Sequence, residues 1–176
     1  MNPSGIILSG GPETVTISSS QKVHKSLLEA KIPILGICYG MQTIAKELGG
    51  SVVNSDVREF GHANISDVNN SILFDSVNFD SNNLDVWMSH GDKVDKIPKN
   101  FEIIASSKDC RVAGFQNLDS NIFGLQFHPE VTHTNQGEKI LSNFIFKVCG
   151  SSKNWSTSDI ICLLYTSDAA DEKRCV

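Results

Sequence analysis

A cysteine flanked by glycines is the residue of this sequence with the clearest capacity for chemistry. Cys38 follows the mostly apolar run 33–37 and precedes 41–48, a segment whose composition suits a helix. In a strand-to-helix turn of this type, Gly36 and Gly40 allow the close backbone approach that pushes a nucleophilic side chain outward. The N-terminus of a helix also favours an anion, and therefore a thiolate. The alternative is a buried structural cysteine.

A histidine and a glutamate follow a second apolar strand. The expected strand 122–127 ends at His128, and the rigid Pro129 separates His128 from Glu130, so both side chains can face one site. A histidine that accepts and returns a proton needs an orienting carboxylate, and a cysteine, histidine and glutamate together have the logic of a nucleophilic triad. Alone, His128 would favour a simpler interpretation as a strand-end histidine bonded to nearby backbone.

A glycine pair follows the first expected strand, 5–9, and three interpretations of it remain open. Gly10-Gly11 could be a plain turn, or a loop whose backbone N–H groups bind an oxyanion. It could also be a phosphate loop, since it loosely resembles the Ser-Gly-Gly-x-Asp-Ser loop of ATP pyrophosphatases. Glu13 and Thr14 replace the Asp and Ser of that loop, and the sequence contains no Walker-type Gly-Lys-Ser/Thr motif.

The elements that must position these residues alternate between strands and helices. Helical spacing is found in 21–31 and again in 135–149, and a strand is expected over 32–37. This succession predicts an α/β fold with a parallel sheet, in which functional groups gather at the carboxyl ends of the strands. The segment 51–83 shows only a weak pattern of short strands and turns. Further strands are expected at 84–92, 101–106, 112–117 and 122–127.

The composition is that of an ordinary globular chain. Its 176 residues suit one domain with a substantial core, since 40% are hydrophobic and 20% are charged. The net charge of −5 gives no electrostatic basis for binding nucleic acid or an anionic membrane, and no apolar run is long enough to span a bilayer. The scattered cysteines predict neither a disulfide framework nor a metal site, and they favour a reducing, cytoplasmic location. They are Cys38, Cys110, Cys149, Cys162 and Cys175.

The motifs around the cysteine and the histidine resemble the class I glutamine amidotransferases. That resemblance rests on Gly36-Ile37-Cys38-Tyr39-Gly40-Met41-Gln42 together with Phe127-His128-Pro129-Glu130. Within the family, the chain resembles the GMP synthase type over roughly residues 2 to 161. The segments that carry this narrower likeness are 3–13, 58–61, 86–94 and 128–134.

The resemblance implies a three-layer class I glutamine amidotransferase-like fold with a mostly parallel central sheet. The family's domain opens with a further strand and helix, so we expect these to be missing here and to leave an unpaired sheet edge. We expect residues 1–150 to form the glutaminase domain and 151–162 to begin a linker to an ATP pyrophosphatase domain. Residues 163–176 resemble translated sequencing-adapter read-through and are expected to be a non-native tail.

The resemblance also implies roles for individual residues. Cys38 would attack the side-chain amide of glutamine, and the backbone N–H groups of Gly11 and Tyr39 would hold the oxyanion. His128, oriented by Glu130, would protonate the departing ammonia and then activate water. No role is predicted for two histidines, His62 and His133, and Cys110 and Cys149 are expected to be packing residues. The implied substrate-binding positions are Gly10, Gln42, Ser89, His90, Gly91 and Asp92.

The function implied by the resemblance is glutamine hydrolysis that supplies ammonia for the amination of xanthosine monophosphate to GMP. The enzyme class would be a carbon–nitrogen ligase with glutamine as amide donor, and the partner would be a synthetase domain that this chain lacks. We expect no cofactor in this domain, because ATP and Mg²⁺ would act only in the synthetase domain. The alternatives are an amidotransferase of another pathway, a stand-alone cysteine hydrolase, and an inactive, poorly folded gene fragment.

Overall fold

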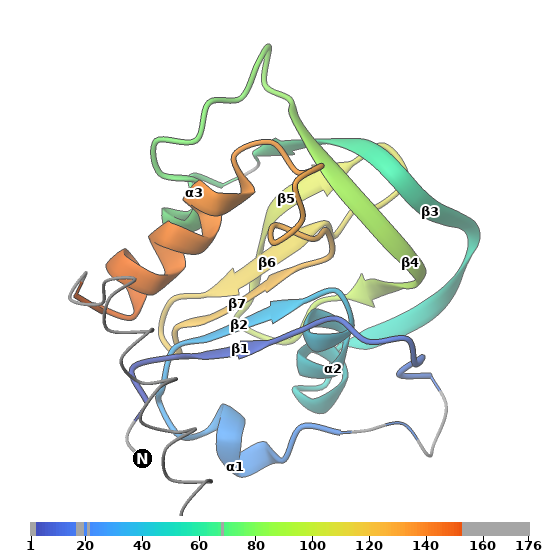
Figure 1. The fold of residues 1–176 in the computed structure, drawn as a ribbon. Coiled ribbons are helices and arrows are strands. Elements are labelled where there is room, and N and C mark those ends of the chain that lie inside the picture. Colours follow the sequence, from blue (N-terminus) through green and yellow to red (C-terminus); the bar gives the residue numbers. More distant parts are fainter. Residues whose placement is uncertain (1–2, 17–19, 21, 68, 153–176) are drawn as a thin grey trace, which may run out of the picture.

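One sheet with helices on both faces organises the chain (Figure 1). The computed structural model describes residues 3–16, 20, 22–67 and 69–152. The strands in this part of the chain are β1 (Ile6–Leu8), β2 (Ile34–Ile37), β3 (Ser51–Asp67), β4 (Leu84–Lys96), β5 (Glu102–Ser107), β6 (Gly114–Asn117) and β7 (Ile122–Leu125). The helices are α1 (Lys25–Leu28), α2 (Tyr39–Glu47) and α3 (Gly137–Ser142), with the 3₁₀-helix η1 (Ile72–Phe74) and the π-helix η2 (Asn143–Val148).

The sheet combines a parallel part and an antiparallel part. Its strand order across the described residues is β1-β2-β7-β6-β5-β3-β4. The pairs β1–β2 and β2–β7 are parallel, whereas every pair from β7 to β4 is antiparallel. The prediction of an α/β fold is therefore confirmed, and the sheet is mixed, with its parallel character confined to three strands. Short connections such as the one between β6 and β7 can join antiparallel neighbours only.

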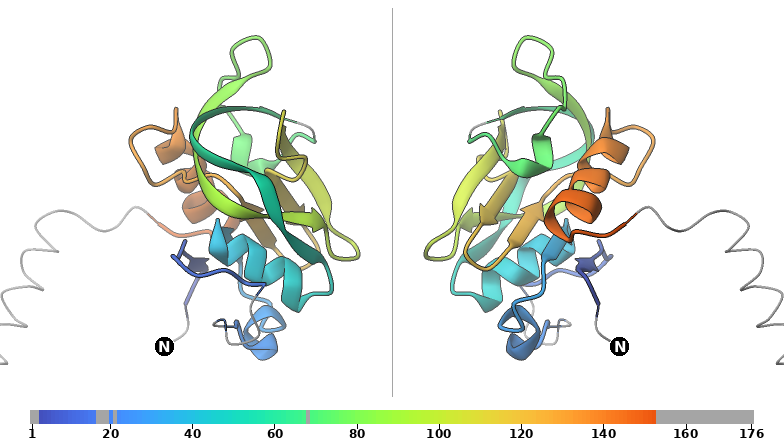
Figure 2. Two further views of the ribbon diagram at one scale, coloured as in Figure 1. Left: turned by 90° about the vertical axis from the view of Figure 1, so that its right-hand side faces the viewer. Right: turned by 90° about the vertical axis from the view of Figure 1, so that its left-hand side faces the viewer.

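Successive residues of the central strands pack into two separate cores. In β2, Leu35 and Ile37 face the core that includes Ile140 and Phe144 of α3 and η2. Ile34 of the same strand faces the opposite core, which contains the apolar side of α2. This alternation is the pattern of a strand buried on both faces. It produces the three layers, with α1 and α2 on one face of the sheet and α3 and η2 on the other (Figures 1 and 2).

Three expected elements differ in extent from the sequence prediction. The helical spacing of 21–31 yields only the four-residue α1, and the helix expected over 135–149 consists of α3 followed by η2. The weak segment 51–83 contains β3, a strand of 17 residues. This strand is long because it pairs with β4 along most of its length and with β5 near its end (Figure 2). Such long-range pairing leaves little local signal in the sequence.

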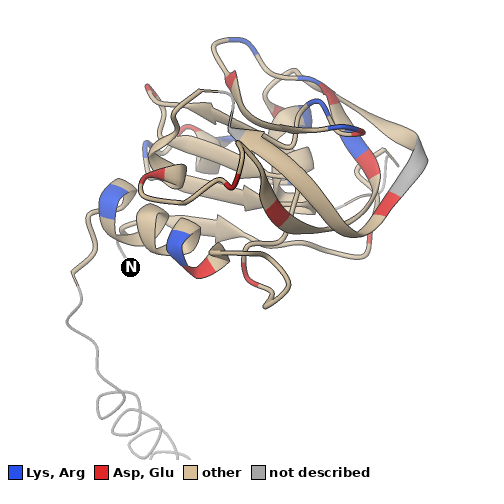
Figure 3. Cartoon of the chain, turned by 90° about the horizontal axis from the view of Figure 1, so that it is seen from above, with Lys and Arg blue, Asp and Glu red and all other residues tan. Residues whose placement is uncertain are grey.

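The edge of the sheet and the end of the described residues can be compared with the predicted domain boundaries. β1 is an edge strand among the described residues, as the prediction of an unpaired edge requires. Most of the expected linker 151–162 and all of the expected tail 163–176 lie outside the described residues. Within the described part, no helix is long and apolar enough to cross a membrane. Acidic and basic residues are interspersed along the chain (Figure 3).

Replacing Gly40 by alanine is expected to destabilise the fold by about 1–3 kcal/mol, the range typical of overpacking. A Cβ at Gly40 would lie 2.1 Å from the carbonyl oxygen of Leu8, so β1 and α2 could not keep their contact. Urea unfolding followed by circular dichroism measures the effect. The control is Glu47→Ala in the same helix, which is expected to change stability by less than about 0.5 kcal/mol. Equal unfolding midpoints for the two variants would contradict this account.

Candidate active site

Cys38 occupies a sharp turn between β2 and α2. Its backbone has φ 51° and ψ −105°, a conformation that a side-chain-bearing residue rarely adopts, and it is the N-cap residue of α2. Its own N–H donates to the carbonyl of Leu125 at 2.7 Å, which ties the turn to β7. A Cβ on Gly36 would lie 2.7 Å from the backbone of Gly40. The predicted sharp strand-to-helix turn is therefore formed, and strained backbone held by close packing is typical of functional sites.

The sulfur of Cys38 is buried but has polar neighbours. The residue is 5% exposed, and its Sγ lies 3.6 Å from the carbonyl oxygen of Ser89. The side-chain amide of Gln126 donates toward the same sulfur at 3.6 Å. The sulfur therefore lies among groups that can polarise and orient it, which differs from the apolar surroundings of an inert structural cysteine.

His128 and Glu130 lie together as the sequence predicts. Nδ1 of His128 and Oε1 of Glu130 are 2.7 Å apart. The backbone N–H of His128 donates to the carbonyl of Trp87 at 3.0 Å, and the hydroxyl of Thr134 donates to the carbonyl of His128 at 2.6 Å. These contacts fix the end of β7, so the histidine is held by both its backbone and its ring.

The ionisation of His128 is coupled to the cysteine. The side-chain interaction with Cys38, followed by the hydrogen bond to Glu130, raises the pKa of His128 from an ordinary 6.5 to about 10. Burial is the largest single influence on Glu130 and acts to raise its pKa, but the hydrogen bond from His128, a backbone hydrogen bond and the charge of His128 together lower the pKa overall. An imidazolium between a sulfur and a carboxylate is consequently the favoured state, and it carries a proton that can be donated.

The glycine loop after β1 closes against the same residues. A Cβ on Gly10 would lie 3.0 Å from Cε1 of His128 and 3.7 Å from Cβ of Cys38. A Cβ on Gly11 would lie 3.7 Å from the ring of Tyr39. The loop thus approaches the cysteine and the histidine at a distance that a larger residue at Gly10 would disturb, and it brings Gly11 beside the side chain of Tyr39.

A pocket of about 430 Å³ lies over the cysteine, a size typical of sites for small molecules. It brings together most of the residues that the sequence predicts to bind substrate. Of these, Gly10 alone does not line it. The catalytic candidates His128 and Glu130 do not line it either, although Gly10 and His128 adjoin Cys38. The lining residues are Gly11, Pro12, Glu13, Thr14, Cys38, Tyr39, Gln42, Asn54, Phe60, Ser89, His90, Gly91 and Asp92.

Asp92 is the buried anion of this pocket, and two residues that sequence reasoning missed hold it. The residue is only 6% exposed. Asn54 donates to its Oδ1 at 3.0 Å, and the hydroxyl of Thr14 donates to its Oδ2. Neither residue belongs to a motif that the sequence analysis singled out as substrate-binding, and both lie far from Asp92 in the chain.

A second set of hydrogen bonds joins this part of the pocket to the nucleophile. Nε2 of Gln42 donates to the backbone carbonyl of Asp92 at 2.7 Å and to Oε1 of Gln126 at 3.2 Å. Gln126 in turn donates toward the sulfur of Cys38. Gln126 is fully buried at the end of an apolar strand, and that isolated amide in the apolar run 122–127 is the signal that could have found it.

His90 contacts a residue outside the pocket, which the sequence analysis does not predict for a substrate-binding residue. It contributes to the pocket lining, but its Nε2 lies 3.2 Å from Oε2 of Glu59 on the neighbouring strand. Burial lowers the pKa of His90 to about 4, so its imidazole is neutral near pH 7. The two histidines without a predicted role also meet a common partner: the rings of His62 and His133 pack against Trp87 at 5.2 and 4.6 Å.

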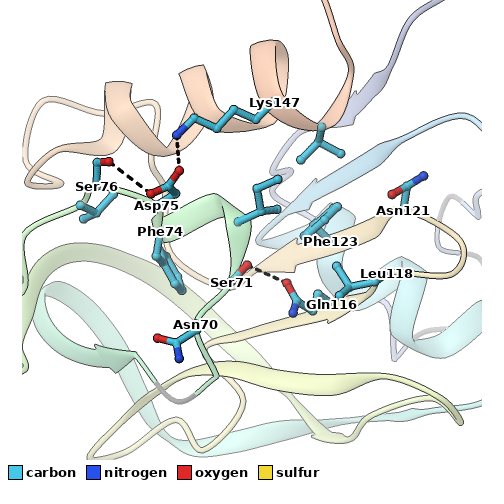
Figure 4. A pocket seen from close by; sticks show the side chains of 13 residues that line it. Asn70, Ser71, Phe74, Asp75, Ser76, Gln116, Leu118, Asn121, Phe123 and Lys147 are labelled. Atoms are coloured by element: carbon cyan, nitrogen blue, oxygen red, sulfur yellow. Dashed lines mark hydrogen bonds and ion pairs between the residues drawn. The ribbon is translucent and has the colours of Figure 1, made fainter.

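A larger hollow of about 700 Å³ lies elsewhere, between η1, β6, β7 and η2 (Figure 4). Lys147 donates to Asp75 at 2.6 Å across its rim, and Ser71 donates to Gln116 at 2.7 Å in its wall. It contains none of the predicted site residues. The pocket above Cys38 is therefore the candidate active site, because it brings the predicted nucleophile and the buried carboxyl group of Asp92 into one cavity.

Comparison with known proteins identifies the family. The model of the class I glutamine amidotransferases matches residues 1–148. Two curated relatives, each named GMP synthase [glutamine-hydrolyzing], are similar in sequence. The one from Ruthia magnifica is 49% identical over 165 residues, 93% of this chain, and the one from Vesicomyosocius okutanii is 48% identical over 161 residues, 91% of this chain. This chain spans about a third of their lengths, 32% and 31%.

Solved structures agree with this assignment. A protein from Thermoplasma acidophilum, described as a proposed GMP synthase subunit, has a TM-score of 0.68 at 34% identity, covering 84% of this chain and 73% of that one. A glutamine amidotransferase from Thermotoga maritima has a TM-score of 0.63 at 25% identity, covering 72% of this chain and 66% of that one. The predicted family and fold class are both confirmed.

The coupling between Cys38 and His128 predicts a specific pH dependence. The folded-state pKa of His128, about 10, lies above the ordinary 6.5 expected in the unfolded chain. Its contribution to stability is therefore complete below about pH 6.5 and is lost as the pH rises through 10. The difference in unfolding free energy between the unmodified chain and His128→Asn should shrink over that interval.

Cys38→Ser is the matched variant for this pH experiment, because the sulfur is the largest cause of the shift. We expect the pKa of His128 in this variant, followed by NMR of the imidazole ring, to fall by one unit or more, about 1.4 kcal/mol. A pKa of His128 that is the same with serine as with cysteine at position 38 would show that the coupling does not exist.

Proposed function

This chain belongs to the class I glutamine amidotransferases, and we propose that it forms the glutaminase part of a GMP synthase. The observation that carries the proposal is the turn at Cys38, whose sulfur adjoins an imidazole paired with Glu130 at the foot of a pocket with a buried carboxylate. The sequence identity with GMP synthases supports that type over an amidotransferase of another pathway.

In the first half of the reaction, the thiolate of Cys38 attacks the side-chain amide carbon of glutamine. The carbonyl oxygen becomes an oxyanion, which the backbone N–H groups of Gly11 and Tyr39 would bind. Stabilisation of this kind is typically worth several kcal/mol. His128 then donates its proton to the amide nitrogen, the carbon–nitrogen bond breaks, and ammonia leaves a thioester on the cysteine. The raised pKa of His128 supports its role as the proton donor.

In the second half, water attacks the thioester. His128, now neutral, takes a proton from the water, and the carbon–sulfur bond breaks to regenerate the thiolate and the imidazolium. Glutamine and water have then given glutamate and ammonia. Glu130 acts through His128 throughout, because its hydrogen bond to Nδ1 keeps Nε2 directed toward the reacting atoms.

Asp92 supplies the recognition of the substrate's ammonium group. Its carboxylate is buried and is held in one orientation by Asn54 and Thr14. A fixed anion in a pocket of this size suits the α-ammonium of glutamine, whose side-chain amide would extend toward Cys38. Gln42 and Gln126 hold Asp92 and Cys38 in position relative to each other, because their hydrogen bonds connect the backbone carbonyl of Asp92 to the sulfur of Cys38.

The ammonia released here would be used by a synthetase domain. We infer this partner because the curated relatives are about three times as long as this chain and are named GMP synthases. Residues 1–150 would be the glutaminase domain and 151–162 the start of the connection to that partner. ATP and Mg²⁺ would act only there, in the amination of xanthosine monophosphate.

Labelling with a glutamine-like electrophile, a chloroketone analogue of glutamine, tests this function. We expect one label per chain by intact mass, full protection by glutamine, and no label on Cys38→Ser. Adding a separately produced GMP synthetase domain with ATP, Mg²⁺ and xanthosine monophosphate should then give glutamate and GMP in equal amounts. The unmodified chain with Cys38 already labelled is the control and should give no GMP from glutamine.

The outcomes separate the alternatives. Labelling without GMP formation would favour an amidotransferase of another pathway or a stand-alone cysteine hydrolase. An unlabelled chain with a disordered circular dichroism spectrum would be an inactive fragment, and an unlabelled chain that is folded would refute the assignment of Cys38 as the nucleophile.

Asn54→Ala is expected to weaken glutamine binding about tenfold, because loss of a hydrogen bond to a charged group costs about 1.5 kcal/mol. Its amide orients Asp92 without touching the reacting atoms. The measurement is the glutamine concentration that halves the rate of Cys38 labelling. Asn64→Ala, an exposed residue of the same strand, is the matched control and should leave that concentration unchanged. Equal protection of the two variants would exclude this role of Asn54.

A further inference from the structure

Three potential metal ligands meet beside the pocket that lies over Cys38. Glu59 of β3, His90 of β4 and Cys110 of the β5–β6 connection each direct one ligand atom to a common point, and these atoms all lie within 4.8 Å of one another. We infer that these three side chains form a buried site for a divalent metal ion of the zinc type. None of the three ligands is a residue proposed to react with glutamine, although His90 also lines the pocket over Cys38.

The geometry resembles that of a zinc site. Nε2 of His90 and Oε2 of Glu59 are 3.2 Å apart. Two ligands at about 2.0–2.1 Å from a tetrahedral zinc ion are separated by about 3.3 Å, so both atoms already have the spacing of neighbouring ligands. A single ion could therefore bind both with little movement of either side chain.

Unsatisfied polar atoms are the second observation that points to a ligand. Oε2 of Glu59 and both ring nitrogens of His90 are buried, yet within the described part of the chain none of them makes a hydrogen bond. The side chain of His90 is only 1% exposed, and Cys110 is fully buried. Buried polar atoms without partners are uncommon and costly, and a shared cation would satisfy two of these three at once.

The charges of the three ligands suit a divalent ion. A carboxylate, a thiolate and a neutral imidazole together balance two positive charges. Burial raises the pKa values of Glu59 and Cys110, the latter to about 12, and lowers that of His90 to about 4. Burial thus disfavours the charged form of each group, and a bound cation would stabilise the carboxylate of Glu59 and the thiolate of Cys110. The other titratable groups that act on the cluster are Lys93, Asp109, Asp92 and His128.

The donor set and its access favour zinc over the lighter cations. Thiolate and imidazole ligands select Zn²⁺ or Co²⁺, whereas Mg²⁺ and Ca²⁺ prefer oxygen ligands throughout. Glu59 also lines a surface hollow with Ser107 and Asp109, which offers an ion a route to the cluster. Three protein ligands leave a fourth position open to water.

Such an ion would stabilise the strand that shapes the glutamine pocket. His90 immediately follows Ser89, whose carbonyl faces the sulfur of Cys38, and it precedes Asp92 by two residues. Fixing His90 to Glu59 and Cys110 would join β3, β4 and the β5–β6 connection. The role we assign to the ion is therefore structural, and its loss would loosen the pocket without removing a reacting group.

Cobalt titration of a chain with one cysteine tests the site. Cys38, Cys149, Cys162 and Cys175 are replaced by serine, which leaves Cys110 and removes the Cys38–His128 pair as a competing metal site. Co²⁺ should then give a thiolate-to-metal charge-transfer band in the near ultraviolet at one ion per chain. Zn²⁺ should abolish that band by displacing the cobalt.

Two further variants identify the ligands. Cys110→Ser in the same background should remove the band, and His90→Gln should weaken cobalt binding at least tenfold. Zn²⁺ should also raise the melting temperature of the unmodified chain but not that of Cys110→Ser, a readout that does not depend on the multiple replacement. Cobalt affinity that is unchanged in His90→Gln would overturn the proposal, as would a zinc-induced thermal shift that survives Cys110→Ser, or the absence of both the band and the thermal shift.

Discussion

The backbone of Cys38 is the constraint on which the rest of the site depends. A residue with a side chain is held here at positive φ, which costs energy that the surrounding packing must supply. Gly36 and Gly40 make this possible, because β2, α2 and the end of β1 approach one another too closely for any Cβ at these positions. The same close approach brings the glycine loop after β1 to the sulfur. Nucleophile, helix N-terminus and loop are thus consequences of one tightly packed turn.

The pairing of β3 with β4 places residues of β4 in two clusters, one around Asp92 and one around His90. Asn54 lies opposite Asp92, and Glu59 lies opposite His90. On β3, Asn54 and Glu59 are five residues apart, whereas their partners on β4, Asp92 and His90, are only two residues apart. An irregularity between Asn54 and Glu59 absorbs the difference. Bulges of this kind redirect side chains beside functional sites. Here the irregularity lets one strand order the carboxylate of the pocket over Cys38 and also support the proposed metal site.

Two histidines near this pocket are held in opposite protonation states by their surroundings. His128 lies between a sulfur and a carboxylate, which favour the charged ring and raise its pKa to about 10. His90 is buried, which favours the neutral ring and lowers its pKa to about 4. A charged ring can donate the proton that ammonia needs, whereas a neutral ring has a lone pair free for a metal ion. The same type of side chain thus suits proton transfer at His128 and metal binding at His90.

The sequence by itself determined the α/β class, the family and the proposed triad of Cys38, His128 and Glu130, because glycine spacing and strand-end motifs are local signals. Only the tertiary structure decided the length of β3, the mixed sheet, and the partners of Asp92, because these depend on pairing between distant segments. Asn54, for example, reaches Asp92 across 38 residues. The scattered cysteines predicted no metal site for the same reason: Cys110 meets its two candidate co-ligands only where β3, β4 and the β5–β6 connection come together in the fold.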